Sequence, residues 1–124
     1  MREAKTLLTA DQLFHLPDDG FCYELVKGEL RRMPPAGGEH GAIVMRLSLL
    51  LGRFIQDNAL GVALGAETGF LIGTDPDTVR APDFAFVRRD RVPEDGIPEG
   101  FWPGPPDLAV EVISPTDTYA AIEE

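Results

Sequence analysis

The sequence predicts an α/β fold that begins with an N-terminal β-hairpin. Three features support this fold class: a long amphipathic helical pattern over residues 39–58, short strand-like runs on both sides of it, and a turn-forming Lys27-Gly28 pair in the first run. The 124 residues suit one domain with a modest core, so we expect a single domain over residues 1–124.

A short helix is expected near the start of the chain. Thr9 and Gln12 have the spacing of a capping box, in which two side chains satisfy backbone N–H groups at a helix start. The helix then runs to Leu16 and is stopped by Pro17, which cannot continue it.

A hairpin is expected over residues 21–33. Lys27-Gly28 forms its turn, because glycine supplies the positive φ that a tight two-residue turn requires. Such a turn sets Glu24 opposite Arg31 on the two strands.

The clearest helix is expected from about Glu39 to Asn58, with Gly61 in its C-cap region. Its apolar residues recur at helical spacing and form one wide stripe along the helix. The stripe consists of Ile43, Val44, Leu47, Leu50, Leu51, Phe54 and Ile55.

Several short strands are expected after this helix. Residues 93–106 interrupt them with five prolines and three glycines, a composition typical of a long loop. A last helix is expected from Thr116 or Thr118 to Glu124. The expected strands are 62–67, 70–72, 79–87 and 108–113. The last of these is apolar on both faces, which is typical of a central strand.

The charge balance weighs against a simple nucleic-acid binder. The formal net charge is −10, and affinity for a polyanion comes mainly from Lys and Arg side chains that neutralise phosphates. Four of the 11 basic residues nevertheless gather around one short apolar segment, either as solvated strand ends or as a local phosphate-facing patch. They are Arg80, Arg88, Arg89 and Arg91.

The chain has the features of a cytoplasmic protein. No apolar run reaches the roughly 18–20 residues of a membrane span, and the first residues lack the apolar region of a secretory signal. The single cysteine, Cys22, cannot form an internal disulfide, which suits a reducing compartment.

Glu111 is the most informative residue of the sequence. It lies in the apolar run 108–113, which contains no basic residue. A buried carboxylate is costly unless it is paired, protonated or bound to a metal, so Glu111 is a candidate metal ligand. A buried ion pair, or an edge position with the side chain in solvent, is the alternative.

Asp83 follows Pro82 inside the expected strand 79–87. A proline cannot donate a hydrogen bond to a sheet, so we expect the strand to be bent, bulged or at an edge there. A bend can aim a neighbouring acidic side chain at a site, although an aspartate here is also typical of a turn or a strand start. Together, Asp83 and Glu111 offer the oxygen ligands that a hard divalent cation prefers.

Four stretches of the sequence resemble, in order, the Uma2 (DUF820) family of endonucleases, within the restriction-endonuclease-like superfamily and its Pro-Asp … (Asp/Glu)-x-Lys motif. No single stretch is specific, but the ordered set is, and it spans nearly the whole chain. The stretches are Tyr23–Leu30, His40 at the head of the long helix, Ala81–Phe84 and Pro106–Pro115.

The resemblance implies a restriction-endonuclease-like mixed sheet flanked by helices, with Asp83 and Glu111 as ligands of Mg²⁺ or Mn²⁺. It also implies that Glu24 and His40 lie near the site as further catalytic candidates. Each has another explanation: Glu24 could form a cross-strand pair with Arg31, worth under about 1 kcal/mol, and His40 could end the apolar stripe.

The lysine of the superfamily motif is missing, because the position two after Glu111 is Ile113 and the only lysines are Lys5 and Lys27. Uma2 relatives carry a lysine on the following helix instead, at a place that would fall just beyond Glu124. We therefore expect the chain to be a C-terminally truncated form of the family domain.

These features predict a metal-dependent nuclease that hydrolyses phosphodiester bonds, with nucleic acid, DNA rather than RNA, as its substrate. The rival is a degenerate nuclease fold that serves as a binding module or as a dimerisation module that forms a homodimer. The charge of −10 and the missing lysine favour this rival. A phosphodiesterase acting on a sugar or metabolite would use the same site.

Overall fold

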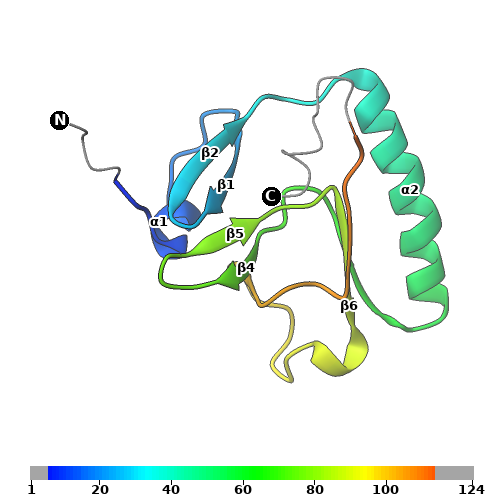
Figure 1. The fold of residues 1–124 in the computed structure, drawn as a ribbon. Coiled ribbons are helices and arrows are strands. Elements are labelled where there is room, and N and C mark those ends of the chain that lie inside the picture. The colour runs from blue at the N-terminus through cyan, green and yellow to red at the C-terminus, as the bar shows by residue number, and fades with distance from the viewer. Residues whose placement is uncertain (1–5, 114–124) are drawn as a thin grey trace. The chain divides into compact units, whose positions relative to one another are not determined.

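The computed structural model describes residues 6–113, which group into two compact units, each assembled from three separate stretches of chain (Figure 1). The final helix expected up to Glu124 lies outside the described residues. The first unit contains the chain up to Pro35, Glu67–Ala81 and Pro93–Pro106. The second contains Ala36–Ala66, Pro82–Val92 and the chain from Asp107 on.

The first unit is built on a five-stranded mixed sheet with the strand order β2-β1-β5-β4-β7. Neighbouring strands are antiparallel except β4 and β7, which are parallel. Its elements are α1 (Ala10–Phe14), β1 (Cys22–Val26), β2 (Glu29–Met33), β4 (Phe70–Gly73), β5 (Thr78–Arg80) and β7 (Trp102–Pro103).

Local sequence signals predicted the start of this unit well. The capping box is present, and in it the Thr9 hydroxyl accepts a hydrogen bond from the backbone N–H of Gln12. The hairpin has the predicted register, with Glu24 opposite Arg31. The helix ends at Phe14, two residues earlier than expected. The residue before a proline disfavours the helical conformation, so Pro17 affects the chain before its own position.

The core of the first unit forms where α1 packs against the sheet. Leu13, Leu25 and Val79 are buried together with Ala10, and Phe70 is fully buried. Burying a side chain of this size stabilises a fold by roughly 1.5–3 kcal/mol, so these few residues account for much of the unit's stability.

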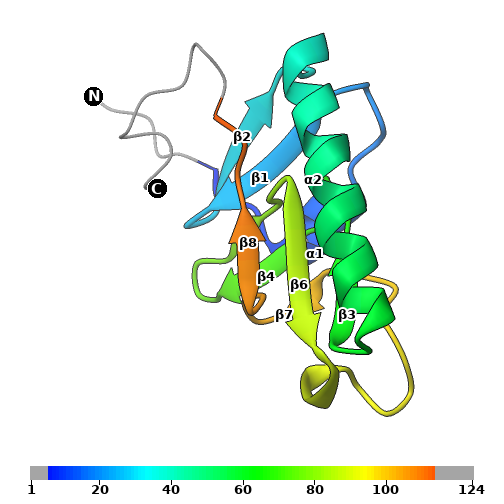
Figure 2. The same ribbon diagram turned by 90° about the vertical axis from the view of Figure 1, so that its right-hand side faces the viewer.

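The second unit places one long helix along a three-stranded antiparallel sheet with the order β3-β6-β8 (Figure 2). Its elements are α2 (Gly38–Asp57), β3 (Gly61–Leu64), β6 (Phe84–Arg88), the 3₁₀ turn η1 (Arg89–Arg91) and β8 (Leu108–Val110). Phe84, Ala85 and Val87 of the central strand β6 are buried.

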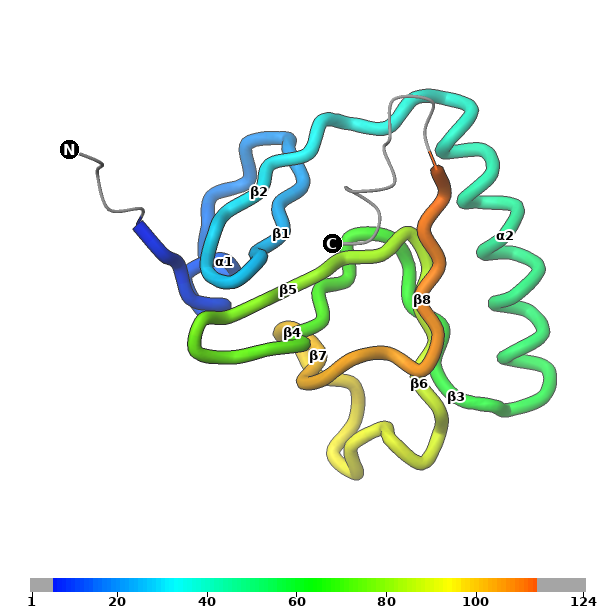
Figure 3. Tube along the Cα trace, in the orientation of Figure 1, coloured from blue at the N-terminus to red at the C-terminus, as the bar shows by residue number. Residues whose placement is uncertain are grey.

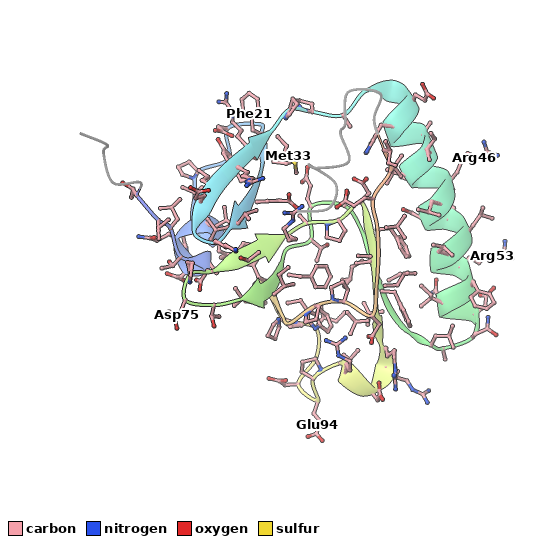
Figure 4. The ribbon with its side chains drawn as sticks, viewed as in Figure 1. Phe21, Met33, Arg46, Arg53, Asp75 and Glu94 are labelled. Carbon is pink, nitrogen blue, oxygen red and sulfur yellow. The ribbon has the colours of Figure 1, made fainter. Side chains whose placement is uncertain are left out.

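The long helix has nearly the predicted limits, but its apolar stripe is covered only in part. Ile55 is the one residue of the described helix that is buried, whereas Leu50 is 73% exposed and Phe54 59%. Arg46 and Arg53 point away from the helix on its outer side (Figure 4). The helix ends at an Asn58 cap rather than near Gly61, which begins β3.

The expected continuous strand over 79–87 is wrong. The chain forms β5, leaves the first unit after Ala81 and begins β6 at Phe84 in the second unit (Figure 3). Pro82 has no N–H to donate, so the ladder cannot continue through it, which is the break that the proline predicted.

The expected central strand over 108–113 is also wrong. Strand β8 ends at Val110 and, among the described strands, pairs with β6 alone, so it lies at the edge of this sheet. Leu108 is 43% exposed and Ile113 63%. An apolar run on both faces therefore did not distinguish a central strand from an edge strand.

Candidate functional site

The two predicted metal ligands lie at the same end of two neighbouring strands. Strands β6 and β8 pair with Phe84 opposite Val110 and Ala85 opposite Ala109. Asp83 immediately precedes β6 and Glu111 immediately follows β8. The same register continued by one residue sets position 83 opposite position 111, where side chains of adjacent strands are within reach of each other.

The Asp83 carboxylate is held by a backbone donor and a histidine. Its Oδ2 accepts a 2.7 Å hydrogen bond from the Val112 amide and lies 3.2 Å from His40 Nε2. The two side chains are mostly buried, at 18% exposure for Asp83 and 16% for His40. The carboxylate thus accepts from the chain just beyond β8, where the ladder of backbone hydrogen bonds has ended.

His40 reaches this carboxylate from the first turn of α2. The helix begins at Gly38 without a side-chain cap, which puts His40 at its third position. The inner face of the helix continues from His40 through the half-buried Val44 to the buried Ile55. The structure therefore brings two of the four predicted site residues, Asp83 and His40, into direct contact.

Glu111 is exposed, contrary to the expectation that it is buried in a central strand. It lies one residue beyond the end of β8 and next to Val112, whose amide binds Asp83. The cost of burying a lone carboxylate consequently gives no argument for a metal at Glu111. Its candidacy depends on its place opposite position 83 and on the family motif.

Glu24 belongs to the first unit, and its contacts lie there. It is 5% exposed and is the one buried charged residue among those described. Its Oε2 accepts a 2.6 Å hydrogen bond from the Ala81 amide and lies 3.6 Å from Arg80 Nε. Arg31 is opposite Glu24 in the register, as predicted, but the sequence did not reveal the bond to Ala81.

The arginines around β6 are largely paired with carboxylates in the described structure. Arg88 lies 2.7 Å from Asp90, and Arg91 lies 2.9 Å from Asp107, a residue that the sequence did not single out. Arg80 pairs with Glu24 of its own unit. These pairs favour the interpretation as strand ends and loops over a phosphate-facing patch.

Among residues 6–113, no group of three or more His, Cys, Asp or Glu side chains is arranged so that it could hold a metal ion. The arrangement instead offers two carboxylate residues at adjacent strand ends. Mg²⁺ is commonly held by one or two carboxylates and keeps several waters, so such a pair fits its requirements.

No helix in the described part of the chain is long and apolar enough to cross a membrane.

The α/β fold, with α1 packed on the mixed sheet of the first unit and α2 along the sheet of the second, is restriction-endonuclease-like. A solved structure supports the class: the crystal structure of "a putative nuclease belonging to DUF820" from Anabaena variabilis ATCC 29413 matches with a TM-score of 0.77 and 21% sequence identity. The match covers 94% of this chain and 64% of that chain, so this chain spans less than two thirds of its neighbour's length.

The chain belongs to the Uma2 family. The family's sequence profile, described as "Putative restriction endonuclease", matches residues 10–123. A search of the curated proteins finds no match.

Proposed function

We propose that this chain carries the metal site of a nuclease that hydrolyses phosphodiester bonds of nucleic acid, with Asp83 and Glu111 as the ligands of Mg²⁺ or Mn²⁺. The observation that carries the proposal is the mostly buried Asp83 carboxylate, held on one oxygen by the Val112 amide and His40, with Glu111 the residue before Val112. Membership of the Uma2 family supports the same reaction class.

The Asp83 carboxylate suits a cation because one of its oxygens is already oriented. Both of its contacts in the described structure use Oδ2, which leaves Oδ1 for a ligand. When bound, a divalent ion would neutralise negative charge on the phosphate and lower the pKa of a bound water, so that hydroxide is available as the nucleophile. Glu111, exposed at the adjacent strand end, provides the second carboxylate.

His40 orients Asp83 in this proposal. Its Nε2, 3.2 Å from Oδ2, restrains the carboxylate opposite the Val112 amide, and at the start of α2 it is also placed to face a phosphate.

Charge-neutral substitutions test the assignment without removing the structural hydrogen bond. In Asp83→Asn the amide oxygen still accepts from Val112, whereas the negative charge is lost. We expect Mn²⁺ binding by calorimetry to weaken at least about tenfold in Asp83→Asn and in Glu111→Gln. Mn²⁺-dependent cleavage of plasmid DNA by the wild-type chain is expected to disappear in the double variant.

The matched control is Glu94→Gln, because Glu94 projects from a loop of the first unit (Figure 4). Its Mn²⁺ isotherm should equal that of the wild type. Cleavage that persists undiminished in the double variant would contradict the proposed site.

The second candidate function is a nuclease fold that has kept binding or dimerisation and lost catalysis. The net charge of −10 and the pairing of Arg80, Arg88 and Arg91 with carboxylates favour it, because little positive charge remains for a polyanion. Such a module has no reason to retain an Mn²⁺ isotherm that depends on Asp83, so the same titration separates the two functions.

A further inference from the structure

Glu24 is buried in a way that its own hairpin does not explain. A buried carboxylate is stable only when its charge and its oxygens are satisfied. The register sets Glu24 opposite Arg31, yet the short contact of Oε2, 2.6 Å, is with the backbone amide of Ala81, 57 positions further along the chain. The carboxylate therefore connects β1 to the segment that follows β5.

That segment leads directly to Asp83. Strand β5 ends at Arg80, and β6 begins at Phe84. Pro82 has no N–H, so the Ala81 amide is the last backbone donor between β5 and Asp83. Glu24 accepts a hydrogen bond from this amide and so restrains the backbone two residues before the proposed metal ligand.

The charge of Glu24 has a partner of its own. Arg80 Nε lies 3.6 Å from Oε2, and the arginine side chain is 23% exposed. Both contacts use the same carboxylate oxygen, and both partners belong to the first unit. These contacts give the carboxylate partners within the protein, without a metal ion.

We propose that Glu24 is a positioning residue that acts through the Ala81 backbone to set the path of the chain into Asp83, and that it is not a metal ligand. The inference rests on the proposed function, because the residue that it positions is the proposed ligand Asp83. It also separates Glu24 from Asp83 and His40, although the resemblance to the Uma2 family implied that all three lie near one site.

Two substitutions distinguish a positioning residue, which holds the Ala81 amide, from a metal ligand. In Glu24→Gln the amide oxygen still accepts from Ala81 while the charge is removed, whereas Glu24→Ala removes the acceptor. We expect Glu24→Gln to keep the Mn²⁺ dissociation constant within about twofold of the wild type and cleavage within about threefold. Asp83→Asn, measured alongside, should weaken Mn²⁺ binding at least about tenfold.

Glu24→Ala should lose at least about tenfold in cleavage at saturating Mn²⁺, at a temperature where circular dichroism shows it folded. Glu24→Gln, which keeps the acceptor, should cleave better than Glu24→Ala at that temperature. If Glu24 served only to stabilise the fold, the two folded variants would cleave equally. The positioning role of Glu24 is contradicted if Glu24→Gln loses Mn²⁺ affinity as Asp83→Asn does, or if folded Glu24→Ala cleaves like the wild type.

Hydrogen exchange of the Ala81 amide, followed by NMR, tests the positioning role independently of activity. Protection should be lost in Glu24→Ala and kept in Glu24→Gln. Equal protection in the wild type and both variants would overturn the proposal. A wild-type chain with neither an Mn²⁺ isotherm nor cleavage would refute the proposed function, while the exchange pattern would still report on the positioning role.

Discussion

Asp107 shows how one side chain can join the ends of two strands. Its Oδ2 accepts from the Arg88 amide at 2.7 Å and from Arg91 Nη1 at 2.9 Å, and its own amide donates to the Phe86 carbonyl. The Arg88 amide, together with the guanidinium of Arg91, lowers the pKa of Asp107 below its usual 3.8. The carboxylate thus stabilises the junction of β6, η1 and β8 in its ionised form.

This lowered pKa predicts a pH dependence of stability. A folded-state pKa below the unfolded one contributes stability above about pH 4, and the contribution is lost as the pH falls through the folded value. Asp107→Asn keeps an acceptor but loses the charge, so it should melt below the wild type at pH 7. Thermal melts should show this difference shrinking as the pH falls below about 4.

Asp90→Asn is the control for Asp107, because Asp90 pairs with Arg88 at the surface, with both side chains over 60% exposed. Its melting temperature should change less at pH 7, since exposed ion pairs contribute little. A difference between Asp107→Asn and the wild type that stays constant from pH 7 to pH 3 would contradict the role given to the Asp107 charge.

Single residues of the site were predictable to different degrees. Asp83 was predicted as a site residue from its proline and from the family resemblance, and the structure places it next to His40, another predicted residue. The bond from Ala81 to Glu24 joins positions far apart in the sequence through one side chain and one backbone group. No periodicity or spacing records such a bond, so the sequence could not show it.

At the scale of elements, β3 lies so close to β6 that one position excludes any side chain. A Cβ at Gly61 would lie 2.1 Å from the Val87 carbonyl oxygen and 2.8 Å from the Arg89 nitrogen. Both atoms are backbone and cannot rotate away, so an added methyl group must push the two strands apart.

Gly61→Ala should therefore destabilise the protein by about 2 kcal/mol or more, as overpacking of a close contact does. Gly65→Ala is the matched control, because no atom lies within 4 Å of its added Cβ. The free energy of unfolding of Gly65→Ala, measured in urea, should be within about 0.5 kcal/mol of the wild-type value. Equal midpoints for the two variants would mean that the β3–β6 contact is looser than the structure indicates.

Elements with a local signal were predicted best. The capping box, the Lys27-Gly28 turn and the long helix depend on neighbours within a few residues, and all three are present. Strand placement depends on partners distant in the chain. The run 108–113 is apolar on both faces, but only the order β3-β6-β8 reveals that β8 is an edge strand with Glu111 exposed beyond it.

At the scale of the whole molecule, the acidic balance limits what the chain can bind. Its 21 acidic residues outnumber the 11 basic ones, and three arginines near β6 already pair with carboxylates. A nucleic acid would therefore have to be bound through a small area rather than through the general field of the protein. The acidic excess is visible in the composition, whereas the pairing of each arginine required the structure.

The two compact units raise the question of how they unfold. The chain passes between them five times, after Pro35, Ala66, Ala81, Val92 and Pro106. Each unit is thus made of three discontinuous stretches, and neither can be completed by one continuous segment. We expect the units to unfold together, as the single domain proposed for residues 1–124 requires.

Each unit carries its own spectroscopic signal for this measurement. Trp102, the single tryptophan, is 3% exposed in the first unit, and the 20-residue α2 of the second dominates the described helix content. Tryptophan fluorescence and circular dichroism at the helix band should give the same urea midpoint and slope. In Gly61→Ala, which alters only the second unit, both signals should shift by the same amount. A fluorescence midpoint that stays at the wild-type value while the helix signal moves would show two separately folding domains.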